Sequence, residues 1–222
     1  MTDLLESTTR SIMNNEENYQ VEISRDDEAR SRKATQARMR RNRRRGLDFE
    51  EEMFGRSARY LVLFLTLNYR KSYREDVSFL TIQRHRDRFV RNMETNSLLR
   101  RIRGCIWHLE EGDRGGGLHL HFLIFYSAER KADVLVARDI GEYWAGVVTK
   151  GWGDYWNSNA HKDHFEYRWG VGLGQVNRKD EVMRRALRTF IAEYMAKCDQ
   201  VPRDRGEDDK LFGIRIFPRR SD

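Results

Sequence analysis

The sequence predicts an α+β fold in which helices cover one face of an antiparallel sheet. Three observations lead to this prediction. Several runs of apolar, aromatic and β-branched residues have the composition of strands, other stretches repeat apolar residues at helical spacing, and a glycine-rich segment separates two adjacent strand-like runs. In chain order these elements give β-α-β-β-α-β-α, which is related to the ferredoxin-like arrangement.

The first elements follow one another from Tyr60. Tyr60–Asn68 is rich in leucine, aromatic and β-branched residues, as expected of a strand. Ser78–Asn92 repeats its apolar residues at the spacing of a helix. Arg101–Glu111 and Leu118–Tyr126 are predicted strands, and Gly112–Gly117 between them has the composition of a hairpin loop. We therefore expect these two strands to be antiparallel neighbours.

Five further segments complete the pattern. Lys131–Trp144 has helical character, and Trp152–His164 is predicted to be an aromatic loop. Phe165–Val176 is assigned as a fourth strand, although its glycines weaken the pattern. Glu181–Lys197 is the clearest helix because its apolar residues lie broadly along one side. Leu211–Pro218 has the composition of a final short strand.

The charge balance points to an anionic partner. The chain of 222 residues contains 42 Lys and Arg against 35 Asp and Glu, which gives a net charge of +7. Nucleic acid is the partner that this balance suggests. The two cysteines form no metal-like spacing, and no apolar run is long enough to span a bilayer. We therefore expect a cytoplasmic protein with no membrane partner.

Residues 1–57 differ from the remainder and are predicted to be a basic, disordered arm, followed by one globular domain at 58–222. Residues 30–45 contain nine Lys and Arg and no acidic residue. Such an excess of one sign repels itself unless a counter-charge is bound, which favours contact with DNA phosphates over a purely solubilising tail. The arginines that we assign to this contact are Arg40, Arg41, Arg43, Arg44 and Arg45.

His119 and His121 stand one residue apart in a predicted strand. Residues i and i+2 of a strand project from the same face, so the two imidazoles form a ready pair of metal ligands. Glu110 and Glu111 lie near the turn of the hairpin, within reach of the histidines, and strand alternation lets only one of them face the pair. One carboxylate and two neutral imidazoles make an open site for a divalent metal ion. Taken alone, the histidine pair fits solvated histidines equally well.

Tyr194 and Lys197 lie three residues apart on the last long helix, so their side chains project from one face. A tyrosine can attack a phosphodiester and hold it as a covalent phosphotyrosine. A lysine beside it would stabilise charge on the phosphate and would favour the phenolate form of Tyr194. Without the other elements, such a tyrosine is more often a core residue.

Together these residues resemble the motifs of a known family. Leu118–Phe122 matches the His-hydrophobic-His motif of the HUH endonucleases, and Tyr194–Lys197 matches their Tyr-x-x-Lys motif. Phe64–Asn68 resembles their first strand motif. Trp107–Glu110, followed by a glycine-rich turn, is similar to the approach to the histidines in the single-tyrosine replication initiators of plasmids and filamentous phages. The resemblance covers roughly residues 58–217, in the expected order.

The resemblance implies an RRM-like sheet and a rolling-circle replication initiator. By position, His119, His121 and Glu110 would bind Mg²⁺ or Mn²⁺, with Glu111 still open as the third ligand. Tyr194 would be the nucleophile that nicks and joins single-stranded DNA at a replication origin, and Lys197 would position the phosphate. Host helicase and polymerase would complete replication, because the chain contains no Walker A sequence.

Two other functions stay open at the level of sequence. A relaxase or transposase of a mobile element shares the histidine pair and the tyrosine, so only the DNA substrate separates it from an initiator. A sequence-specific DNA-binding regulator would keep the fold without catalysis. It predicts DNA binding that neither a chelator nor the loss of Tyr194 affects.

Some side chains allow two interpretations. Thr66 and Asn68 either contact DNA or cap strand ends. His161 and His164 suggest a second metal motif, but their loop offers no third ligand with obvious geometry. Three aromatic residues of the predicted loop either stack on unpaired bases or anchor the loop, namely Trp152, Tyr155 and Trp156.

Overall fold

The computed structural model describes residues 2–198, 200–206 and 209–218. It divides into two compact units, of which the first ends at Arg41 and the second begins at Asn42. Helix α1 (Thr2–Arg56) contains this boundary, and its residues from 42 onward belong to the second unit. In the part of the chain that is described, no helix has both the length and the apolar character needed to cross a membrane.

The C-terminal end of α1 belongs to a folded core, which differs from the predicted boundary at residue 57. Phe49, Met53 and Phe54 are at most 3% exposed and pack with the sheet and with α5 (Glu181–Phe190). Glu50 is fully buried and accepts a hydrogen bond of 2.8 Å from Arg184 of α5. Several arginines lie directly before these residues and dominate the local composition. The sequence pattern therefore did not reveal that the apolar side chains behind them are part of the core.

All strand pairs in the six-stranded sheet are antiparallel. The strand order is β4-β1-β3-β2-β6, and β5 also pairs with β1. The predicted α+β class and the predicted hairpin of β2 and β3 are therefore confirmed. The strands are β1 (Arg59–Tyr69), β2 (Ile102–Gly112), β3 (Gly117–Ser127), β4 (Gly153–Asn157), β5 (Gly174–Asn177) and β6 (Phe212–Ile216).

The helices begin where polar side chains can cap them. Ser78 accepts a hydrogen bond from the backbone N–H of Thr81 at the start of α2, and Asp180 accepts one from that of Met183 at the start of α5. Two of the three predicted helices, Lys131–Trp144 and Glu181–Lys197, end in a π-helical turn. The remaining helices and turns are α2 (Phe79–Asn92), α3 (Asp133–Tyr143), α4 (Asp163–Glu166), the π-helical η4 (Trp144–Val148) and η6 (Ile191–Met195), and the 3₁₀ turns η1 (Lys71–Tyr73), η2 (Leu99–Arg101), η3 (Asp113–Gly115) and η5 (Ser158–Ala160).

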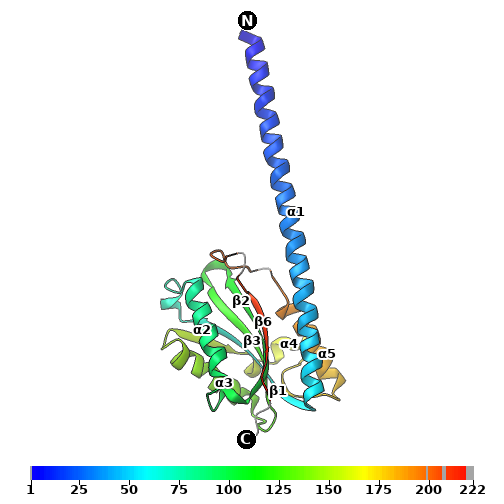
Figure 1. Ribbon diagram of the computed structural model, residues 1–222, viewed down its shortest axis with the longest axis vertical. Helices are drawn as coiled ribbons and strands as arrows, with labels where there is room; N and C mark the ends of the chain where they lie inside the picture. The colour runs from blue at the N-terminus through cyan, green and yellow to red at the C-terminus, as the bar shows by residue number, and fades with distance from the viewer. Residues whose placement is uncertain (1, 199, 207–208, 219–222) are drawn as a thin grey trace. The chain divides into compact units, whose positions relative to one another are not determined.

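The sheet is buried on both faces, so the structure has one helical layer more than predicted. On β1, Leu63 and Leu65 pack with α2 and α3 in one core, whereas Val62 and Phe64 pack with α5 and the end of α1 in a second core. Figure 1 shows α2 and α3 on one side of the sheet and α5 on the other. Strands covered on both faces consist of continuous apolar runs, and residues 60–65 of β1 are such a run, so the sequence contained a sign of the second cover that the prediction did not use.

The predicted loop Trp152–His164 contains regular structure. Its β4 pairs with β1, and η5 and α4 follow. Glycine, aspartate and asparagine are depleted in strands, so the composition of β4 concealed it, and pairing with a long neighbouring strand outweighs that weak propensity. The predicted strand Phe165–Val176 is shorter in the structure, because Phe165 belongs to α4 and the strand begins only at Gly174.

Asn159 fills a gap in the sheet beside β1. On one edge of β1, β4 pairs from Leu65 onward and β5 pairs up to Val62, which leaves the backbone between them without a strand partner on that edge. The Asn159 side chain takes that place: it accepts a hydrogen bond of 2.9 Å from the N–H of Phe64 and donates one of 3.0 Å to the carbonyl of Val62. Buried backbone groups need such partners, so Asn159 joins the β4–α4 connection to β1.

Candidate metal centre and tyrosine

One end of the sheet is polar on the face that carries α5. On β3 the side chains of this face change from the apolar Leu123 to His121 and His119. The strand register places Thr66 of β1 opposite His121 and Glu110 of β2 opposite His119. Residues directly opposite one another in an antiparallel pair share a face, so polar side chains from three adjacent strands form one group.

Glu110, His119 and His121 form the centre of this group. Oε2 of Glu110 lies 3.1 Å from Nε2 of His121 and 3.6 Å from Nε2 of His119. One ligand atom from each residue lies within 4.8 Å of the others. Two imidazole nitrogens and one carboxylate oxygen are a donor set that suits a divalent ion. The three residues could therefore hold a divalent metal ion, as the predicted spacing required.

Hydrogen bonds at the far ring nitrogens orient both imidazoles. Nδ1 of His119 lies 3.2 Å from the carbonyl oxygen of Gly117, and Nδ1 of His121 lies 3.0 Å from Oγ1 of Thr66. A carbonyl can only accept, so Nδ1 of His119 donates this hydrogen bond, and Nε2 is the ring nitrogen that faces Glu110. In both rings Nε2 is thus directed at Glu110 while the other nitrogen is held by a fixed partner, as is usual for a metal-binding histidine.

His108 is a fifth polar residue of the group, beside Thr66, Glu110, His119 and His121. It precedes Glu110 by two positions on β2, so both side chains share a face, and Nδ1 of His108 lies 3.2 Å from Oε1 of Glu110. The second carboxylate oxygen is thus engaged while Oε2 faces the two other histidines. His108 was not assigned to the site from the sequence, although the alternation that selects Glu110 selects it as well.

The protonation states of the group favour a cation. Burial opposes ionisation of Glu110, but hydrogen bonds from His119 and His121 and the nearby His108 outweigh it and hold the pKa of Glu110 well below its ordinary value. Burial lowers the pKa of His121, and the hydrogen bond to Glu110 opposes this only in part. A carboxylate beside a neutral imidazole is the state in which such a set binds a metal ion.

Tyr194 reaches this group from the π-helical turn η6. Its hydroxyl oxygen lies 3.3 Å from Nε2 of His121. Its ring stacks on Phe190 at 5.0 Å between centroids and meets the edges of Phe64 and Trp169 at 5.7 and 5.3 Å. Aromatic contacts on several sides fix the ring, so the hydroxyl is aimed at the metal-binding group by packing.

Lys197 lies beside Tyr194, but the pKa of the phenol is raised. Nζ of Lys197 lies 5.7 Å from the centroid of the Tyr194 ring, so the two side chains do come together. Burial nevertheless raises the pKa of Tyr194 to about 12, with a further contribution from Glu110, and nearby Arg168 opposes these effects only in part. The phenol is therefore neutral at physiological pH.

The remaining candidate residues on the sheet are Glu111, Thr66 and Asn68. Glu111, the alternative third ligand, accepts a hydrogen bond of 2.8 Å from the N–H of Arg203 and is not in the ligand group. Thr66 is engaged with His121. Asn68 lies two residues further along β1, and its Oδ1 is buried without a hydrogen-bond partner in the described part of the chain.

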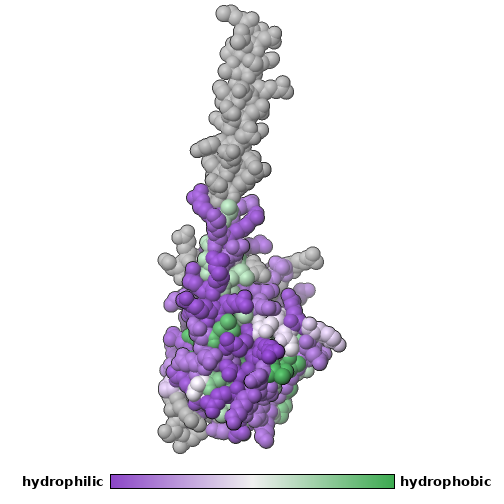
Figure 2. Space-filling model, turned by 90° about the vertical axis from the view of Figure 1, so that its right-hand side faces the viewer, coloured by the Kyte–Doolittle hydropathy of each residue, from purple (hydrophilic) through white to green (hydrophobic). Residues whose placement is uncertain are grey.

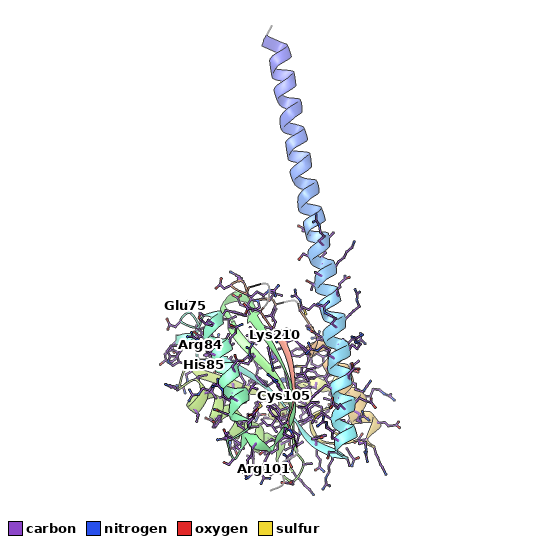
Figure 3. The ribbon with its side chains drawn as sticks, viewed as in Figure 1. Glu75, Arg84, His85, Arg101, Cys105 and Lys210 are labelled. Carbon is purple, nitrogen blue, oxygen red and sulfur yellow. The ribbon has the colours of Figure 1, made fainter. Side chains whose placement is uncertain are left out.

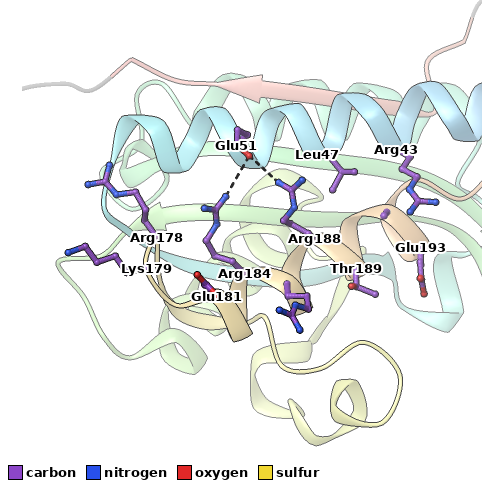
Figure 4. A pocket seen from close by; sticks show the side chains of 12 residues that line it. Arg43, Leu47, Glu51, Arg178, Lys179, Glu181, Arg184, Arg188, Thr189 and Glu193 are labelled. Atoms are coloured by element: carbon purple, nitrogen blue, oxygen red, sulfur yellow. Dashed lines mark hydrogen bonds and ion pairs between the residues drawn. The ribbon is translucent and has the colours of Figure 1, made fainter.

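The predicted phosphate-binding arginines belong to both units. Arg40 and Arg41 are exposed residues of the first unit. In the second unit, Arg44 is exposed and the guanidinium of Arg45 lies 5.6 Å from the centroid of the Phe212 ring. Arg43 lines an open groove of about 710 Å³ along α5, which Figure 4 shows.

This groove carries more positive than negative side chains. Arg184 and Arg188 are held by ion pairs with Glu50 and Glu51. Figure 2 views the α5 side of the molecule, where hydrophilic residues surround small hydrophobic patches. The other cations of the groove have no ion pair within the described ranges, namely Arg43, Arg178, Lys179 and Arg185.

Comparison of the chain with protein families, with curated proteins and with solved structures finds no match. The assignment of the candidate site therefore rests on the positions of its side chains and not on a relative. Of the residues expected from the sequence, the structure brings together Glu110, His119, His121, Tyr194 and Lys197, and it adds His108 as a contact of Glu110.

Proposed function

We propose that this protein is a metal-dependent endonuclease that nicks and rejoins single-stranded DNA through Tyr194, as the HUH replication initiators that it resembles do. The observation that carries the proposal is the position of the Tyr194 hydroxyl, 3.3 Å from a histidine of the Glu110–His119–His121 group. A nucleophile beside a site for a divalent ion is the arrangement that phosphoryl transfer to a side chain requires.

The donor set supports Mg²⁺ or Mn²⁺ as the ion. Glu110 contributes the hard oxygen that both ions prefer, and the two imidazoles favour Mn²⁺ over Mg²⁺. When bound, such an ion would offset the negative charge that builds on the phosphate during the reaction.

The side chains of this chain would perform the remaining steps. Tyr194 forms a bond from its phenolic oxygen to phosphorus, and the bond from phosphorus to the 3′-oxygen breaks. The phenol loses its proton, and the 3′-oxygen gains one and leaves as a hydroxyl group. The 5′-phosphate stays on Tyr194, and Lys197 beside the ring stabilises its charge. Attack by a new 3′-hydroxyl reverses the reaction and joins the strands.

The biological role follows from this chemistry. A nick that leaves a free 3′-hydroxyl can prime a host polymerase, with a host helicase separating the strands. Relaxases and transposases would use the same residues on a different DNA, so the chemistry is common to these candidates and the substrate separates them.

Transfer of DNA to the protein tests the proposal. A pool of single-stranded oligonucleotides with randomised sequence and a label at the 3′ end is incubated with Mn²⁺ or Mg²⁺. We expect the label to migrate with the protein on a denaturing gel, because the fragment downstream of the nick stays on Tyr194. Sequencing the attached DNA would identify the preferred site.

Two variants make this assay decisive. Tyr194→Phe keeps the ring and its aromatic contacts and should abolish the adduct, whereas Tyr167→Phe, at a residue that is 97% exposed, should leave it unchanged. A chelator should suppress the adduct in the wild type. A protein that binds DNA tightly but never becomes labelled would instead be a regulator, and an adduct that persists in Tyr194→Phe would refute the role of this residue.

A further inference from the structure

Trp156 is an exposed aromatic residue on the face of the metal-binding group. It is 48% exposed, which is unusual for a tryptophan in a sheet. In the register of β4 and β1, Trp156 lies opposite Thr66, and on the other side of β1 Thr66 lies opposite His121. Opposite residues share a face, so Trp156, Thr66 and His121 form one row across three strands.

The row gives the separation between the backbone at Trp156 and the backbone at the candidate centre. Adjacent strands are about 4.8 Å apart, so the backbones at Trp156 and His121 are separated by roughly 10 Å. That is the length of about three stacked nucleotides at a rise of 3.4 Å each. A strand with one phosphodiester at Tyr194 would therefore bring a base about three nucleotides away to the indole.

Two histidines support the indole from one side. The ring of His161 stacks on Trp156 at 4.4 Å with an angle of 15° between planes, and His164 stacks on His161 at 5.7 Å and 18°. Because His161 covers one face of the indole, the exposed area lies on its other face and edges. The two histidines, which the sequence suggested as a second metal motif, are instead part of a column of planar rings.

The connection that carries this column is rigidly held. Asn159 joins it to the backbone of β1 and also donates a hydrogen bond of 2.8 Å to Asp133 of α3. Lys162, next to His161, forms an ion pair with the same Asp133. A ring that is fixed before a ligand arrives loses little entropy on binding, which favours stacking.

The two other aromatic residues of this segment are engaged elsewhere. Tyr155 packs against the core on the opposite face, and its hydroxyl donates a hydrogen bond of 2.9 Å to Glu142. Trp152 stacks face to face on Tyr73, at 5.3 Å and 4°. Of the three candidates, Trp156 is the one that presents a ring beside the candidate centre.

We propose that Trp156, backed by His161 and His164, is a stacking platform for an unpaired base of the DNA strand that enters the centre at Tyr194. The inference rests on the proposed function for its ligand. A base that stacks there must be unpaired, because a duplex keeps the faces of its bases covered. Stacking accepts any base, so the platform would select single strands without selecting sequence.

The binding of a fluorescein-labelled oligothymidylate, followed by anisotropy in the presence of EDTA, tests this proposal without cleavage. Trp156→Ala should weaken binding by roughly 5- to 100-fold, the range expected for one base–aromatic contact. Trp156→Phe keeps a ring and should stay within about threefold of the wild type. Trp152→Ala is the matched control, at a second exposed tryptophan, and should change the affinity by less than about twofold.

An abasic oligonucleotide separates stacking from other effects. Removing the bases should weaken binding to the wild type by the same factor as Trp156→Ala, and it should have no further effect on that variant. Equal binding of both DNAs by the wild type, or an unchanged affinity of Trp156→Ala, would overturn the platform. Thermal unfolding of each variant establishes that it is folded.

The platform and the proposed function can fail independently. If Tyr194 forms an adduct but Trp156→Ala binds DNA as the wild type does, only the platform is refuted. If no adduct forms but single-stranded DNA binds through Trp156, the platform stands and the nuclease activity is refuted.

Discussion

At the scale of single residues, the charge of Glu110 is the feature on which the candidate site depends. Its two oxygens face His108 on one side and His119 and His121 on the other, within 3.6 Å. A buried carboxylate is stable only when hydrogen bonds or an opposite charge compensate it. The three imidazoles provide that compensation in the protein alone, and a divalent ion would do so in the loaded site.

Glu110→Gln should weaken the binding of Mn²⁺ by at least about 100-fold, because it removes the one anionic ligand and keeps the size of the side chain. Isothermal titration calorimetry on protein first treated with a chelator measures this. Glu111→Gln is the control: its carboxylate contacts Arg203 outside the ligand group, and affinity should stay within about twofold. Equal losses in both variants would mean that Glu110 is not a ligand.

Strand alternation predicted the central residues of the site. It placed His119 and His121 on one face, and the hairpin placed one of two glutamates beside them. The contact of Thr66 with His121 depends on the register between β1 and β3, which no local pattern fixes. The environment of Tyr194 depends on Phe64 and Trp169, which are far from it in the chain, so its raised pKa could not be predicted.

At the scale of elements, β1 is held by side chains as well as by strands. Asn159 replaces a strand partner between β4 and β5, and on the other face the hydroxyl of Tyr69 lies 2.9 Å from Nδ1 of His85 on α2. Figure 3 labels His85 on α2. These two polar contacts attach neighbouring elements to the strand that carries Thr66.

Asn159→Ala should lower the free energy of unfolding by about 2–4 kcal/mol, because it leaves a buried N–H and a buried carbonyl of β1 without partners. Urea unfolding followed by tryptophan fluorescence measures this. Asn157→Ala removes an amide that donates to the carbonyl of Val134 at a more exposed position and accepts a hydrogen bond from the N–H of Asn159, and it should cost about 1 kcal/mol. Equal costs in the two variants would contradict the special place of Asn159 in the sheet.

His85 should make the stability depend on pH. Burial, assisted by Arg88, lowers the pKa of His85 below its ordinary value of 6.5. The unfolded chain therefore binds the proton first on acidification, so the contribution of His85 is complete above a pH of about 6.5 and is lost as the pH falls below it. Thermal unfolding at several pH values should show a smaller acid-induced fall in His85→Gln than in the wild type. Identical pH profiles would exclude this role.

Most elements were predictable because their periodicity is strong, and those that were missed depend on distant partners. β4 contains residues that disfavour strands and exists because β1 offers an edge beside it. The helical end of α1 was hidden by its arginines, although Phe49 and Met53 have helical spacing. α5 was predicted as a helix, but no local pattern indicated that it covers the face opposite α2 and α3, together with the end of α1.

At the scale of the whole molecule, the excess of positive charge is distributed unevenly. The groove along α5 gathers several cations, of which two are held by Glu50 and Glu51. The same helix continues into η6, which carries Tyr194. A DNA strand bound at Tyr194 therefore has a basic surface on the helix that supplies the nucleophile.

Replacing Arg43, Arg178 and Arg185 by alanine should reduce the salt dependence of single-strand binding. Each lost phosphate contact lowers the slope of log K against log salt by about 0.7, so the triple variant should lose about 2. A variant with alanine at Arg84, Arg91 and Arg100, exposed residues on the α2 side, has the same net charge and should keep the wild-type slope. Equal slopes in the two variants would show that DNA binding depends on net charge and not on the arginines of the groove.

The central position of β1 also has a consequence for how the chain acquires its structure. β1 is the first strand to be synthesised, yet its partners extend from β3 to β5, and Arg59 pairs with the distant Asn177. Pairings between distant segments form slowly, because the intervening chain must first be closed into a loop. During synthesis the apolar run of β1 therefore stays unpaired until β3 has left the ribosome, and its pairing is complete only after β5 has followed. We expect refolding from denaturant to be slow and sensitive to protein concentration.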